Sequence, residues 1–229
     1  MCFSAIASFT ASTLLIPTGL YCLHSAQHRD RRYQSLATIP LLFGIQQACE
    51  GGVWVGLQHH NPALSHISAL LFLAFSHGCW LIWVPWSVAQ CEPHPVKQRV
   101  CYSLLAIGTL FALSLQIPFW SDVHTVAPQI LRGSIDYQTV LWWDAWVTRD
   151  LLHLIYGCIV VVPFILTGNL ALQGFAALIA LSAIITHLTA HDAFVSVWCF
   201  WAALISLNLG IILHRLPAIA PTSDATIAP

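Results

Sequence analysis

The sequence predicts an all-α polytopic membrane protein built as a bundle of seven transmembrane helices. Of its 229 residues, 58% are hydrophobic and only 7% are charged, whereas a soluble domain is about 25% charged. So few charged side chains cannot cover a soluble globule, which excludes soluble enzymes and disordered proteins. A formal net charge of −1 also argues against nucleic acid as a partner. The expected partner is the lipid bilayer.

Seven stretches reach the length of a spanning helix, which needs about 20 predominantly apolar residues. In chain order they cover residues 3–24, 36–57, 67–89, 100–119, 151–166, 170–190 and 194–213. Polar clusters separate them, at residues 28–34, 58–61, 90–99, 121–136, 167–169 and 191–192. The last break is so tight that it predicts an abrupt helical hairpin. We expect residues 1–216 to form one transmembrane domain and residues 217–229 a short disordered cytoplasmic tail.

The loop charges predict that the N-terminus lies outside and the C-terminus inside, because cytoplasmic loops are enriched in Lys and Arg. With this orientation, the inner side holds six of the 8 Lys and Arg residues: Arg29, Arg31, Arg32, Lys97, Arg99 and Arg215. The outer side holds only Arg132 and Arg149, together with five acidic residues: Asp122, Asp136, Asp144, Asp150 and Asp192.

Four stretches bring ionisable side chains, Glu50, His77, His153 and His187, to the outer half of the bundle. Because such groups are costly in a bilayer, they predict a functional site there, and the histidines nearest the outer ends predict a metal site. His187 and His191 are four residues apart, a spacing that places two zinc ligands on one helix face. His153 would complete a three-His Zn²⁺ site, and Asp150 would orient an imidazole or bind the metal itself. The alternative is that these His side chains extend to the lipid headgroups and cap helix ends.

Glu50 is the candidate catalytic residue, because a buried carboxyl can act as a general base or proton shuttle. It lies about 12 Å below the outer end of its stretch, given a rise of about 1.5 Å per residue. Gln46 is placed to hydrogen-bond to Glu50, and Trp54 to close the outer mouth of the site. The alternative is a protonated Glu50 that only joins neighbouring helices by donating a hydrogen bond.

Three other features are second-tier candidates. His77 lies deeper in the third stretch and is a haem ligand, a proton-relay residue or a core histidine bonded to a carbonyl. Removal of Met1 would expose Cys2, whose amine and thiol could chelate a metal, supply a nucleophile or accept an acyl chain. Residues 140–148 either extend the fifth helix outward or lie along the interface as a lid over the site.

The segments 1–9 (MCFSAIASF), 40–47 (PLLFGIQQ) and 50–54 (EGGVW) resemble an uncharacterised family of small bacterial integral membrane proteins. This resemblance implies a multi-pass protein of the bacterial inner membrane and no particular activity. A looser likeness, in helix number and the His-x-x-x-His pair, is to alkaline ceramidases and adiponectin receptors. In those zinc hydrolases the pair lies on the last helix, whereas His187 and His191 lie on the sixth. Retinal is excluded as a cofactor, because the only lysine, Lys97, lies in a loop.

The leading functional hypothesis is a zinc-dependent membrane hydrolase that acts on a lipid-like substrate in the outer half of the bundle. A second hypothesis is electron transfer, with His153 and His187 on either side of a b-type haem. A third is a non-enzymatic protein, a transporter or a subunit of a larger complex, in which Glu50 and His77 form a proton path or only pack.

Overall fold

The computed structural model describes residues 4–215. Its α-helices are α1 (Ala5–Arg29), α2 (Gln34–Ala37), α3 (Ile39–Gln58), α4 (Pro62–Ala74), α5 (Trp80–Cys91), α6 (Pro95–Ser121), α7 (Arg149–Leu166), α8 (Leu170–Thr189), α9 (Phe194–Ser206) and α10 (Asn208–His214). A π-helix covers Phe75–Cys79, and 3₁₀-helices cover Arg31–Tyr33, Val123–Thr125, Trp142–Ala145 and His191–Ala193. The two strands are β1 (Val126–Leu131) and β2 (Ser134–Thr139). Cys2 and the expected tail at 217–229 lie outside the described residues.

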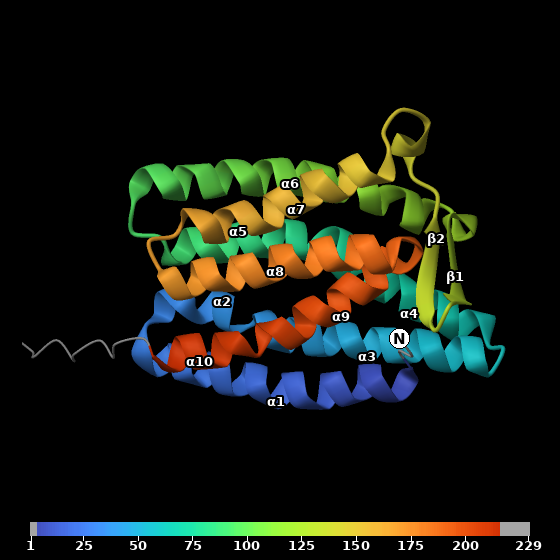
Figure 1. The fold of residues 1–229 in the computed structure, drawn as a ribbon, viewed down its shortest axis with the longest axis horizontal. Coiled ribbons are helices and arrows are strands. Elements are labelled where there is room, and N and C mark those ends of the chain that lie inside the picture. The colour runs from blue at the N-terminus through green and yellow to red at the C-terminus, as the bar shows by residue number, and fades with distance from the viewer. Residues whose placement is uncertain (1–3, 216–229) are drawn as a thin grey trace, which may run out of the picture.

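The α-helices form seven rods that lie side by side (Figure 1), because α4 continues through the π-helix into α5 and α9 continues into α10. Each rod coincides with one of the seven predicted stretches, which confirms the all-α prediction. Within residues 4–215, six rods are long and apolar enough to cross a membrane. The exception, α3, is long enough, but Gln46, Gln47 and Glu50 lower its hydropathy. These three side chains are buried inside the bundle, where α3 packs against α1, α4 and α9.

Polar capping residues mark where several helices begin. Ser4 Oγ accepts a hydrogen bond from the Ala7 amide at the start of α1. Asn61 does the same for α4, directly before Pro62, whose fixed φ and missing N–H suit the first position of a helix. Thr148 caps α7 and Asn169 caps α8. These caps satisfy amide groups that would otherwise be left without partners at the helix ends.

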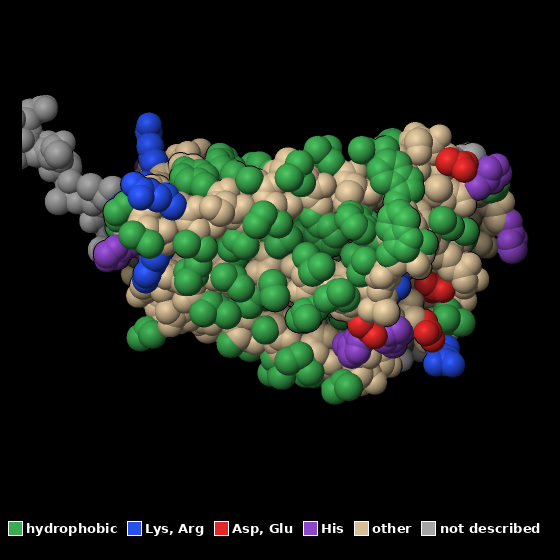
Figure 2. Space-filling model, turned by 90° about the horizontal axis from the view of Figure 1, so that it is seen from above, with side chains coloured by type: hydrophobic (Ala, Val, Ile, Leu, Met, Phe, Trp, Pro, Cys, Tyr) green, Lys and Arg blue, Asp and Glu red, His purple; other side chains and the backbone are tan. Residues whose placement is uncertain are grey.

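The charged side chains lie at the two ends of the rods. Figure 2 shows one face, on which hydrophobic side chains cover the middle while basic, acidic and His side chains gather at the ends. The basic end is formed by the α1–α2 and α5–α6 connections and the end of α10, and the opposite hairpin end carries β1 and β2 (Figure 1). At the basic end, the hydrogen-bonded guanidinium of Arg32 lowers the pKa of the Asp30 carboxyl. This separation of charge is the one used above to predict the orientation in the membrane.

The antiparallel hairpin of β1 and β2 was not predicted, because most of it falls in the polar cluster 121–136, which predicts a loop. Arg132 and Gly133 form the turn with positive φ angles of 50° and 78°. Ile135 and Tyr137 of β2 are buried, and the Tyr137 ring stacks on Phe72 of α4 at a centroid distance of 4.7 Å. The hairpin therefore covers one end of the bundle.

Both alternatives for residues 140–148 are wrong. The fifth rod begins only at Arg149, so the segment does not extend the helix. It does not cover the predicted site either. None of its residues lines the cavities beside Asp150, His187 and His191, and the Trp143 indole donates a hydrogen bond to Ser114 of α6 at 3.0 Å. The hairpin, rather than this segment, covers the polar interior at this end.

Glycine allows the closest approaches between rods. A Cβ added to Gly19 of α1 would lie 2.3 Å from the backbone nitrogen of Leu41 in α3. A Cβ added to Gly108 of α6 would lie 2.2 Å from the carbonyl oxygen of Leu81 in α5. Small residues let membrane helices pack backbone against backbone in this way.

Candidate metal centre

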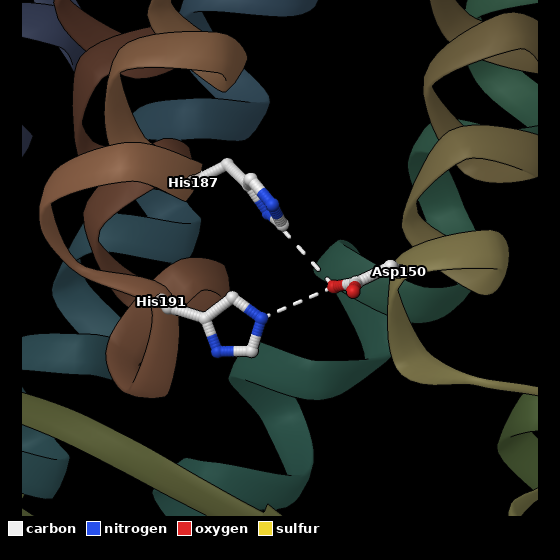
Figure 3. A group of neighbouring side chains, drawn as sticks. All are labelled: Asp150, His187 and His191. Carbon is white, nitrogen blue, oxygen red and sulfur yellow. Dashed lines mark hydrogen bonds and ion pairs between the residues drawn. The ribbon is translucent and has the colours of Figure 1, made fainter.

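Asp150, His187 and His191 form a cluster at the hairpin end (Figure 3). The His191 Nε2 atom lies 3.1 Å from Asp150 Oδ1, and His187 Nδ1 lies 3.9 Å from the same oxygen. One potential ligand atom from each residue lies within 4.8 Å of the others, and this group was found among the residues that the structure describes. The cluster brings together three of the four metal ligands expected from the sequence.

Three separate elements supply the cluster. Asp150 is the second residue of α7, and His187 lies in the last turn of α8. The α8 helix ends at Thr189, so His191 opens the following 3₁₀-helix instead of continuing the same helical face. The two imidazoles nevertheless stay together, with ring centroids 5.0 Å apart, because this short helix holds the α8–α9 turn as tight as predicted.

The spacing fits a tetrahedral metal ion. Two ligands that each lie about 2.0–2.2 Å from a zinc ion are about 3.3–3.6 Å apart, and the two distances to Asp150 Oδ1 fall on either side of this range. The side chains of His187, Asp150 and His191 are 41%, 62% and 55% exposed. They can therefore adjust around an ion and leave a coordination position open to water.

His153 lies outside this cluster, which corrects the expected three-His ligand set. Its ring stacks on Phe194 of α9 at a centroid distance of 4.2 Å, and its Nδ1 atom is buried without a hydrogen-bond partner among the described residues. Phe194 also lies edge-on to His187, at 6.3 Å. His153 is thus a neighbour of the cluster, and the Phe194 ring contacts both His153 and His187.

A polar cavity of about 550 Å³ lies beneath the hairpin, next to the cluster. We call it the hairpin cavity. Its wall includes β2, the start of α7 and the 3₁₀-helix that carries His191. His77 and His153 both line it, so the deep histidine of the third stretch reaches the same polar space. His77 also pairs with the neighbouring Ser76 hydroxyl at 2.9 Å and contacts the edge of Phe119.

Glu50 lies elsewhere in the bundle. It is buried, and the Ser196 hydroxyl of α9 donates a hydrogen bond to its Oε1 atom at 2.5 Å. The expected Gln46–Glu50 hydrogen bond is not formed: Gln46 Oε1 accepts from the Trp80 indole at 2.7 Å, and Gln46 Nε2 has no partner among the described residues. Trp54 is 3% exposed and packs in the core with Phe72 and Leu115 rather than at an open mouth. Glu50 joins α3 to α9 and is not among the residues that line the hairpin cavity.

One comparison agrees with the predicted resemblance to an uncharacterised family. A family model described as a family of unknown function (DUF6629) matches residues 1–223. The chain belongs to this family. No curated protein and no solved structure matches the chain. The DUF6629 assignment therefore supplies no activity, and the candidate site has to be argued from its own geometry.

Some features of this DUF6629 protein were not predicted as parts of the site. Arg149 lines the hairpin cavity and donates hydrogen bonds to Thr139 of β2 and to Asp144, which holds the start of α7 against the hairpin. Its position in the sequence showed only a basic residue in an outer loop. Ser196, the partner of Glu50, could have been noticed as a hydroxyl in an otherwise apolar stretch.

We predict that Glu50→Gln leaves the fold and any bound metal unchanged, because Gln retains an acceptor for the Ser196 hydroxyl. Glu50→Ala leaves that buried hydroxyl without its partner and should cost about 1–3 kcal/mol of stability. Thermal melting and metal analysis of the two purified variants would check this. Loss of metal in Glu50→Gln, with unchanged melting, would contradict the structural role and restore Glu50 as a site residue.

Proposed function

We propose that this protein is an integral membrane metalloenzyme that holds a Zn²⁺ ion with Asp150, His187 and His191 and hydrolyses its substrate there. In this proposal the hairpin end faces the outside of a bacterial inner membrane, in keeping with the loop charges. The observation that carries the proposal is the convergence of one carboxylate and two imidazoles, from three elements, on a single exposed point. Two His and one carboxylate are a ligand set of catalytic zinc sites, in which water takes the open fourth position.

The chemistry would be hydrolysis of an acyl bond. A zinc ion lowers the pKa of its bound water and polarises a carbonyl group. The water oxygen bonds to the carbonyl carbon, the carbon–nitrogen or carbon–oxygen bond breaks, and the water proton ends on the leaving nitrogen or oxygen atom. His153, beside the cluster, is the side chain best placed to carry that proton, since its Nδ1 atom has no partner in the described part of the chain.

Metal analysis tests the first half of the proposal. The purified protein is expected to hold about one equivalent of zinc, and His187→Ala/His191→Ala is expected to lose it. The matched control is His59→Ala/His124→Ala, which removes two exposed histidines from the same end of the bundle and should retain the metal. Less than about 0.2 equivalents in the wild-type protein, unchanged in the double variant, would overturn the proposal.

Removal of the metal tests the second half. A chelator should abolish hydrolysis of acyl amides or esters, and Zn²⁺ should restore it, while Ca²⁺, which prefers oxygen ligands, should not. The absorption spectrum of the same preparation tests the haem hypothesis. A Soret band that disappears in His153→Ala would favour haem over zinc, although in the structure Phe194 contacts both histidines that would hold it.

A further inference from the structure

An apolar groove of about 520 Å³ runs between α7 and α8 on the outside of the bundle. Leu154, Val161, Ala183 and Ile184 line its walls, and Gly157 leaves space within it, because nothing lies within 4 Å of a Cβ added there. Both helices are among the rods that are long and apolar enough to cross a membrane. In a bilayer the groove therefore opens to lipid rather than to water.

The groove leads directly to the candidate metal centre. Asp150 and His187 line it at its polar end, while His191 lines the hairpin cavity. His153 and Phe194 line both spaces. The three ligands thus stand at the junction of an apolar groove and a polar cavity.

We infer that the groove binds the acyl chain of a membrane amphiphile whose polar head group enters the hairpin cavity, with the linkage between them beside Asp150, His187 and His191. This inference rests on the proposed function for the chemistry at the junction, but the binding of the chain does not need the metal. The substrate class is therefore an acylated amphiphile that reaches the site sideways from the outer leaflet.

The dimensions of the groove suit this occupant. From Asp150 to Ile165 the α7 wall extends about 22 Å at about 1.5 Å per residue. Half of a hydrocarbon core of about 30 Å is about 15 Å, so the groove is long enough to hold a chain from the interface to beyond the bilayer centre. A helix from another chain suits the groove less well than an acyl chain, because it would cover the exposed polar side chains of Asp150 and His187 at the polar end.

The hairpin cavity suits a head group that forms hydrogen bonds. Gln129, Gln138 and Thr139 of the hairpin line it with polar side chains, together with Arg149, which donates a hydrogen bond to Thr139. Two of its charged groups are paired, because Arg149 pairs with Asp144 and the carboxylate of Asp192 lies 3.7 Å from Arg132. The carboxylate of Asp136, which also lines the cavity, accepts a hydrogen bond from Gln129 and has no ion pair among the described residues. The cavity thus favours a polar head group without net negative charge.

Photo-crosslinking with a single-chain lipid tests the inference. The probe is a lysophosphatidylcholine with a diazirine in the middle of its acyl chain, added to the full-length protein in nanodiscs. Cross-links are expected in peptides of α7 and α8, and excess palmitoyl-lysophosphatidylcholine should compete with them. Gly157→Leu fills the groove and should reduce this labelling at least fivefold. The control Gly174→Leu adds the same side chain to α8 outside the groove, also into open space, and should retain the labelling.

Each outcome of this experiment decides the inference. Labelling spread evenly over all the outward-facing helices, or labelling unchanged in Gly157→Leu, would mean annular lipid only and would overturn it. A disulfide between the Cys158 thiols of two copies, in a parallel oxidation of the same preparation, would identify a second chain as the occupant and would also overturn it. The variant His187→Ala/His191→Ala separates the two proposals, since it should keep the labelled groove while losing the metal. Labelled α7 and α8 peptides in a protein that holds no zinc would support acyl-chain binding in the groove and contradict only the proposed metal chemistry.

Discussion

Replacing Gly19 with Leu is expected to destabilise the bundle severely. The added Cβ would lie 2.3 Å from the Leu41 nitrogen and 2.6 Å from its Cα atom, and both belong to the α3 backbone, which cannot rotate away. The α1–α3 pair would have to separate, at a cost of at least about 3 kcal/mol, against a total stability of about 5–15 kcal/mol for a typical domain. The measurements are size-exclusion profile and thermal melting in detergent.

Gly174→Leu is the matched control for this prediction. It makes the same chemical change within an α-helix, but nothing lies within 4 Å of the added Cβ. Leucine favours a helix more than glycine does, by up to about 1 kcal/mol, so this variant should melt at or above the wild-type temperature. A Gly19→Leu protein that melts together with the control would show that the α1–α3 contact is looser than the structure has it.

Asp150→Asn is expected to weaken metal binding by roughly 100-fold or more while leaving the fold intact, because it removes the charge that both imidazoles share. The carboxylate is exposed and makes its contacts with His187 and His191 across the α7–α8 gap, so the bundle does not depend on it. Titration of the metal-free protein with Zn²⁺ measures the change. The control is Asp192→Asn, the neighbouring acid at the same end, whose exposed pair with Arg132 at 3.7 Å contributes little. Equal losses in both variants would indicate a diffuse charge effect and no metal site.

The membrane rods could be predicted from the sequence because hydropathy and polar breaks are properties of single stretches. The hairpin could not, because Val126–Leu131 contains Pro128 and does not alternate buried and exposed positions, so its pairing depends on the partner strand and on Phe72 beneath it. For α3, the sequence predicts the stretch 36–57 but not which neighbouring rods bury its polar residues.

The candidate site was predicted only in part because sequence spacing gives depth along a helix and not direction around the bundle. Asp150 and His153 are three residues apart, which turns their side chains by about 60°. That angle suffices for Asp150 to face the end of α8 while His153 stacks on Phe194 of α9. Glu50 lies about 12 Å below the outer end of its stretch, and its hydrogen bond to Ser196 joins α3 to α9 instead of bringing it to the cluster.

The π-helix at Phe75–Cys79 sets the rotation of α5 relative to α4 within their common rod. The Trp80 amide donates to the Phe75 carbonyl, five residues back, so this turn holds one more residue than a turn of α-helix. One residue corresponds to about 100° of rotation. Deletion of a single residue here would therefore keep the rod straight and helical but rotate one half against the other. His77 would then turn away from the hairpin cavity, or the whole apolar stripe of α5 would turn away from its neighbours. The rod tolerates side-chain exchange far better than a change of length.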